Sequence, residues 1–111
     1  DPTCADPFYR RSVRVSMGEL LHLPIVRCAE WAETFDEVAT AGFEIWALTP
    51  ASDAADIFTM TPPSRWALVV GSEGSGLSGD TLTRCINVRI PMSNGVDSLN
   101  VGHAVAAALA R

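Results

Sequence analysis

Two loops rich in glycine and small polar residues carry the side chains of this chain that are best suited to chemistry. The first loop, residues 71–78, reads GSEGSGLS, and the second, residues 90–101, reads IPMSNGVDSLNV. Each follows an apolar run typical of a buried strand, and each leads into a predicted helix. Strand-to-loop-to-helix junctions of this kind build small-molecule sites in α/β sheets. The two loops together therefore predict one ligand site.

The residue types in these loops indicate which ligand would fit. Gly71 and Gly74 would let the backbone approach a ligand closely. Glu73 supplies an acceptor for a cationic or hydroxyl-bearing group. Ser98 is predicted to cap the final helix, and Asn100 offers amide donors and an acceptor near its start. These groups suit a neutral or cationic adenosyl ligand better than a dinucleotide.

A dinucleotide-binding fragment is the alternative, because the first loop contains a G-x-G-x-x-G pattern at Gly74, Gly76 and Gly79. In a dinucleotide fold this pattern seats pyrophosphate at a helix N-terminus. However, Glu73 stands directly beside that position and would repel phosphate. The next strand also ends in Ile90 rather than in an acid suited to a ribose hydroxyl. The context therefore counts against this alternative.

The elements that must position these loops alternate between helix and strand. The pattern predicts an α/β fold with a mostly parallel sheet flanked by helices. Asn94-Gly95 is predicted to turn between the last strand and the last helix. The expected helices are 6–17, 28–41 (ended by Gly42), 51–58, 80–85 and 98–110, and the expected strands are 20–26, 43–48, 65–70 and 86–90.

Length and cysteine usage limit the class of protein. The chain has 111 residues with 48% apolar content, which is enough for one domain with a modest core. No apolar run reaches the roughly 20 residues that span a bilayer, so no membrane association is expected. Three widely spaced cysteines form no C-x-x-C pair, and no metal-ligand pattern occurs. We therefore expect no disulfide and no metal, and a cytoplasmic location.

Charge argues against bulk attraction to nucleic acid. The net charge is −5, and all eight basic residues are arginine. A net acidic domain does not bind nucleic acid through its overall field. Arg10, Arg11 and Arg14 nevertheless cluster within five residues. This cluster is either a solvated helix face or a local phosphate contact, since the guanidinium fork matches phosphate oxygens.

At these motifs the chain resembles the SpoU-type RNA ribose methyltransferases of the SPOUT superfamily. The resemblance covers nearly the whole chain, and its motifs are long, ordered and correctly spaced. The second and third motifs of the family resemble residues 71–74, 76–78, 90–92 and 98–101. The segment between its first and second motifs resembles residues 6–11 and 14–18.

The resemblance implies a C-terminal trefoil knot, in which the final helix passes through a loop formed near residues 71–78. It also implies S-adenosylmethionine as cofactor and methyl transfer to a ribose 2′-hydroxyl of tRNA or rRNA, in a protein whose full-length form is a homodimer. Glu73 and Asn100 match residues that organise the catalytic centre. The implied cofactor contacts are Leu48, Thr49, Gly71, Gly74, Ile90, Met92, Ser98 and Leu99.

One part of the family pattern is missing from this sequence. The first motif, Asn…Gly…Arg-x-Ala, carries the arginine usually assigned as the base, and we expect it to precede Asp1. Residues 1–111 would then be a single SpoU-type domain without its first-motif segment, and they would be inactive alone if that arginine is required. A non-catalytic knotted module for RNA binding or dimerisation stays open as an alternative.

Overall fold

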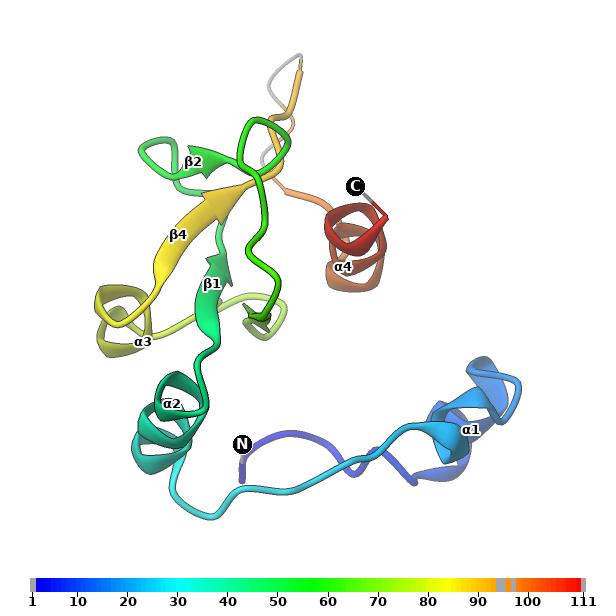
Figure 1. Cartoon of the computed structure of the whole chain (residues 1–111). Coiled ribbons are helices and arrows are strands. Elements are labelled where there is room, and N and C mark those ends of the chain that lie inside the picture. Colours follow the sequence, from blue (N-terminus) through cyan, green and yellow to red (C-terminus); the bar gives the residue numbers. More distant parts are fainter. Residues whose placement is uncertain (1, 94–95, 97, 111) are drawn as a thin grey trace. The chain divides into compact units, whose positions relative to one another are not determined.

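The structure is a computed structural model that describes residues 2–93, 96 and 98–110 (Figure 1). It divides into two compact units, Asp1–Glu37 and Val38–Arg111. The turn predicted at Asn94-Gly95 lies outside the described residues. Among the described residues, none of the helices combines the length and apolar character needed to cross a bilayer.

The first unit is helical, and two of its sequence predictions are wrong. The first helix, α1 (Arg10–Val15), begins later than predicted because Asp6 accepts a hydrogen bond from the Phe8 N–H at 3.0 Å and so forms a turn. The predicted strand over residues 20–26 is wrong, because a 3₁₀ helix occupies Glu19–His22. Pro24 has no N–H to donate to a neighbouring strand, and none of the described strands pairs with residues 20–26.

The second unit contains a four-stranded parallel sheet, which confirms the predicted α/β class. In space the strands follow the order β2-β4-β1-β3. Figure 1 shows this sheet between α3 and α4. The strands are β1 (Glu44–Leu48), β2 (Ala55–Asp56), β3 (Trp66–Val70) and β4 (Ile86–Arg89), and the helices are α3 (Gly79–Thr83) and α4 (Val101–Leu109).

The helix predicted over 51–58 is also wrong, since this segment contains β2. Ala55 pairs with Val88 and Asp56 with Arg89, so residues 55–56 form a parallel strand pair with β4, which a helix at this position could not do. The Asp56 carboxylate accepts a hydrogen bond from the Phe58 N–H at 2.9 Å, which favours a turn after the pair. By contrast, α2 (Trp31–Thr40) ends as predicted, with Gly42 at a φ of 84°.

The largest hydrophobic cluster lies on one face of the sheet and packs α4 against it. Trp46, Ile57, Val88 and Ala108 are fully buried together. Side chains alternate along a strand, and the β1–β4 register places Trp46 and Val88 on the same face. Ala108 from α4 packs on that face, and Trp66 adds a ring contact with Trp46 at 5.0 Å. This packing fixes α4 beside the strand ends that carry the two loops.

Candidate functional site

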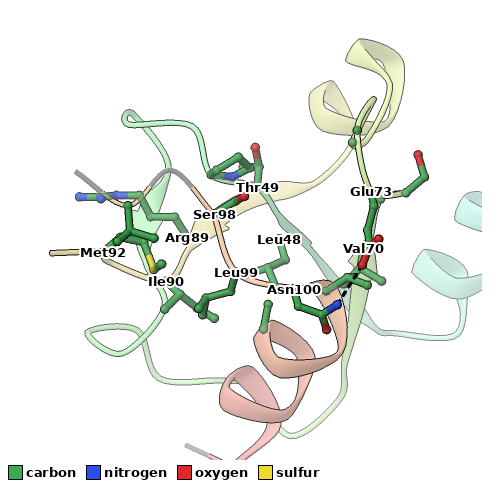
Figure 2. A pocket seen from close by; sticks show the side chains of 18 of the residues that line it. Leu48, Thr49, Val70, Glu73, Arg89, Ile90, Met92, Ser98, Leu99 and Asn100 are labelled. Atoms are coloured by element: carbon green, nitrogen blue, oxygen red, sulfur yellow. Dashed lines mark hydrogen bonds between the residues drawn. The ribbon is translucent and has the colours of Figure 1, made fainter. Parts of the chain in front are cut away.

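The ends of three parallel strands meet at one edge of the sheet and form a pocket. Leu48 of β1 pairs with Val70 of β3 and with Val88 of β4, so the loops that follow these strands begin side by side. Together with the start of α4 they line a pocket of about 660 Å³ (Figure 2). Small-molecule sites occupy roughly 300–1,000 Å³ and favour this edge of α/β sheets. The pocket is therefore a candidate ligand site.

Every site residue predicted from the sequence lines this one pocket. They come from the ends of β1 and β4, the loop after β3, and the segment that leads into α4. Their direct contact with a ligand stays a prediction. These residues are Leu48, Thr49, Gly71, Glu73, Gly74, Ile90, Met92, Ser98, Leu99 and Asn100.

Sequence reasoning missed several residues of the pocket wall. Pro50 and Ser52 belong to the connection after β1, which had been predicted to be helical from residue 51. Arg89 lies at the end of β4 and is a charged residue that enters the lining. Its position immediately before Ile90 is the signal that could have revealed it, because strand ends at this edge face the site.

The loop after β3 is held by hydrogen bonds between its own residues. The Gly76 N–H donates a hydrogen bond to the Ser72 carbonyl at 3.1 Å, and the Ser72 and Ser75 hydroxyls lie 2.8 Å apart. A Cβ added to Gly71 would lie 2.3 Å from the Gly76 carbonyl carbon and 2.6 Å from the Leu77 nitrogen. Gly71 thus makes room for the returning loop, which is a different reason for glycine from the close approach to a ligand predicted from the sequence.

Gly74 has a different reason to be glycine. Its φ is 106°, in the region that side chains of L-residues disfavour, while an added Cβ would meet nothing within 4 Å. The observed conformation of the loop therefore favours glycine here because of this φ, and not because space for a side chain is lacking. Gly74 lines the pocket, so its backbone is accessible to a ligand on this open side.

Asn100 joins the two loops. Its Oδ1 accepts a hydrogen bond from the Gly102 N–H at 3.0 Å, and its Nδ2 donates to Glu73 Oε1 at 2.9 Å. Figure 2 shows this second bond running from the start of α4 to the first loop. Asn100, not Ser98, caps the final helix, so the predicted cap is wrong. The amide of Asn100 makes both bonds at once, because its oxygen accepts at the helix while its nitrogen donates to the loop.

The charged side chains that line the pocket are of opposite sign. Glu73 and Arg89 lie on opposite sides in Figure 2, with Leu48 and Leu99 between them. The Arg89 Nε donates to the Ala54 carbonyl at 3.1 Å, which ties the end of β4 to the connection before β2. The pocket therefore suits a small ligand with an apolar body and separated charges of both signs.

Two substitutions at Asn100 separate its role as helix cap from its bond to Glu73. Asn100→Ala removes the cap and the link to Glu73, and we expect it to lower the free energy of unfolding by about 1–2 kcal/mol. Asn100→Ser restores a capping oxygen but not the link, and it should recover about 1 kcal/mol of that loss. Urea unfolding measures both values.

A double-mutant cycle with Glu73→Ala isolates the link itself. Because both side chains are exposed, we expect a coupling free energy of only about 0.5–1 kcal/mol between Asn100 and Glu73. Glu73→Gln is the matched control, since its amide oxygen can still accept the bond. A coupling of zero would show that the two loops are not held together by this contact.

Comparison with known proteins places these features in a family. Residues 1–110 match the SpoU rRNA Methylase family. An uncharacterized tRNA/rRNA methyltransferase of Mycobacterium tuberculosis is 47% identical over 111 residues, which cover 96% of this chain and 38% of that protein. This chain thus spans about two fifths of the length of that relative.

Solved structures agree with this comparison. The SpoU methyltransferase AviRb from Streptomyces viridochromogenes, in complex with the cofactor AdoMet, has a TM-score of 0.83 and 33% identity over 96% of this chain and 44% of its own. A structure described as an RNA 2′-O ribose methyltransferase has a TM-score of 0.73 and 30% identity over 96% of this chain and 40% of its own. Both similarities extend over nearly the whole chain.

Proposed function

The chain belongs to the SpoU rRNA methylase family, and from this membership we propose that it is the S-adenosylmethionine-binding part of an RNA 2′-O-ribose methyltransferase acting on tRNA or rRNA. The observation that carries the proposal is the pocket at the strand ends, which is lined by both motif loops. The AdoMet complex of AviRb and the 2′-O ribose methyltransferase structure support the cofactor and the reaction.

The residues of the pocket fit this cofactor. Its volume of about 660 Å³ suits a ligand of this size. Leu48, Ile90 and Leu99 offer apolar surface for an adenine ring, and Glu73 offers a carboxylate for a positive charge. When bound, the cofactor supplies an electrophilic methyl group on a sulfonium. The chain would hold it through strand-end and loop residues, namely Leu48, Thr49, Gly71, Gly74, Ile90, Met92, Ser98 and Leu99.

Glu73 and Asn100 would organise the reacting end of the site. Transfer to a ribose hydroxyl requires in-line placement of that oxygen and a base for its weakly acidic proton. The hydrogen bond from Asn100 leaves the second carboxylate oxygen of Glu73 without a role in the loop contact, so that oxygen can orient a hydroxyl. The family's base arginine belongs to a motif that residues 1–111 do not contain.

The proposal extends to architecture and assembly. We propose that residues 1–111 are one SpoU-type domain without its first-motif segment, that the final helix passes through the loop at 71–78 as a trefoil knot, and that the full-length protein is a cytoplasmic homodimer. The bond between Asn100 and Glu73 supports the knot, because it brings the start of α4 against that loop.

Calorimetric titration tests the cofactor proposal. The chain should bind S-adenosylmethionine and its demethylated product, S-adenosylhomocysteine, and it should not bind NAD under the same conditions. The expected reason is that Glu73 repels the pyrophosphate of NAD beside the glycine loop, whereas neither adenosyl ligand contains phosphate and the sulfonium of S-adenosylmethionine is attracted to the carboxylate. Binding of NAD without either adenosyl ligand would overturn the proposal in favour of a dinucleotide site.

A transfer assay tests the reaction. With an upstream first-motif segment restored, radioactive methyl from S-adenosylmethionine should enter tRNA or rRNA. Methylation of a 2′-hydroxyl removes the nucleophile for alkaline cleavage of the next phosphodiester, so the label should appear in alkali-resistant dinucleotides. Label in mononucleotides would indicate base methylation. Cofactor binding without transfer would favour the non-catalytic module.

A further inference from the structure

A group of arginines on the short helix α1 has no role in the pocket. Arg10, Arg11 and Arg14, here called the arginine cluster, line a separate hollow of about 460 Å³ together with Tyr9 and Val15. All three arginines are exposed. Arg10 and Arg14 are four residues apart and Arg11 and Arg14 three apart, so their side chains are neighbours on the helix surface.

The charges of this cluster are uncompensated in the described chain. Arg27 is paired with Asp6 at 3.6 Å, but no described carboxylate forms an ion pair with a member of the cluster. No acidic residue lies in the first turn of α1. Like charges three and four residues apart repel each other. A helix of six residues with three such charges therefore gains stability when an anion lies between them.

We propose that the arginine cluster binds the phosphodiester backbone of RNA. The inference rests on the proposed RNA methyltransferase function. Guanidinium groups bind phosphate oxygens through paired N–H donors, and the hollow lets several of them reach one strand. The exposed ring of Tyr9 borders the same hollow and offers a stacking surface for a base. This contact is local, which reconciles RNA binding with a net charge of −5.

A solvated face is the simpler explanation of the same residues, and its expected behaviour differs. Solvated arginines contribute to binding only through net charge, so any three arginines would serve equally. A phosphate site depends on these three. The chain offers a comparison of equal charge, because Arg27, Arg65 and Arg84 are also exposed and lie outside the hollow, although Arg27 pairs with Asp6 and Arg65 lies over the Phe43 ring.

The experiment measures fluorescence anisotropy of a fluorescein-labelled 12-nucleotide single-stranded RNA with the 111-residue chain at 50 to 200 mM salt. The test variant is Arg10→Gln/Arg11→Gln/Arg14→Gln, and the control is Arg27→Gln/Arg65→Gln/Arg84→Gln, which has the same net charge. A third variant replaces the cluster by lysine. Calorimetry with S-adenosylmethionine is run on each protein.

We expect the glutamine variant of the cluster to lose at least about tenfold in RNA affinity at 50 mM salt, with the control remaining much closer to the unsubstituted chain. Three phosphate contacts at about −0.7 each give a salt slope near −2, so affinity should fall roughly 20-fold between 50 and 200 mM in the unsubstituted chain and much less in this variant. The lysine variant should keep most of the slope. Cofactor affinity should not change.

Several results would overturn the inference. These are an equal loss in the control, an unchanged salt slope in the glutamine variant, no RNA binding by the unsubstituted chain, or competition by poly-glutamate as strong as that by RNA, which would indicate an acidic protein partner. Competition by free inorganic phosphate at low concentration would point to a small anion instead. Absence of cofactor binding in the unsubstituted chain would contradict the proposed function separately.

Discussion

Replacing Gly71 by alanine is expected to reduce S-adenosylmethionine affinity at least about 100-fold and to lower the free energy of unfolding by about 1–3 kcal/mol. The added methyl would lie 2.3 Å from the Gly76 carbonyl carbon and 2.6 Å from the Leu77 nitrogen. Both atoms belong to backbone, so no side chain can rotate away. The loop must move instead, and it forms one wall of the pocket.

Gly79→Ala is the control for this change. Gly79 is the first residue of α3, and an added Cβ there would meet nothing within 4 Å. Alanine favours a helix over glycine, so this variant should be as stable as the parent or slightly more stable. Calorimetry and urea unfolding compare the two proteins. If Gly71→Ala bound the cofactor within threefold of the parent, the compact loop would not be required for the pocket.

The part of the fold that could be predicted is the part that local pattern determines. Residues 43–48, 65–70 and 86–90 are apolar runs bounded by turns, and all three are strands of the parallel sheet. The ends of these strands also located the site, because parallel strands present their following loops at one edge. The pocket therefore follows from the order of elements, before any side-chain detail.

What could not be predicted depends on contacts between distant residues. The strand β2 exists because β4 offers an edge to Ala55 and Asp56, which nothing within residues 51–58 reveals. Asn100 caps α4, and its amide also donates a hydrogen bond to Glu73, which is 27 residues away, so this second bond cannot be predicted from the local sequence. Likewise, only glycine fits at position 71 because the backbone of Gly76 would clash with an added Cβ.

Gly74 has a positive φ but open space around its Cα, so replacing it tests the backbone conformation of the loop without introducing a clash. Gly74→Val should lower cofactor affinity by roughly 5- to 150-fold, which corresponds to about 1–3 kcal/mol for a non-glycine residue held at a positive φ. The free energy of unfolding should change by less than about 1 kcal/mol. The reason is that an added Cβ meets nothing within 4 Å, so the exposed loop can relax to another conformation without a clash.

A graded series at Gly74 distinguishes the causes. Asparagine tolerates positive φ better than alanine, and β-branched valine tolerates it least, so cofactor affinity should fall in the order Asn, Ala, Val. The measurement is calorimetry on the three variants, with urea unfolding to confirm that each is folded. Equal losses in all three would mean that a side chain of any kind blocks close approach of the ligand to the Gly74 backbone. Unchanged affinity in the valine variant would mean that the cofactor does not bind against this loop. The pocket at the strand ends would then not be the S-adenosylmethionine site.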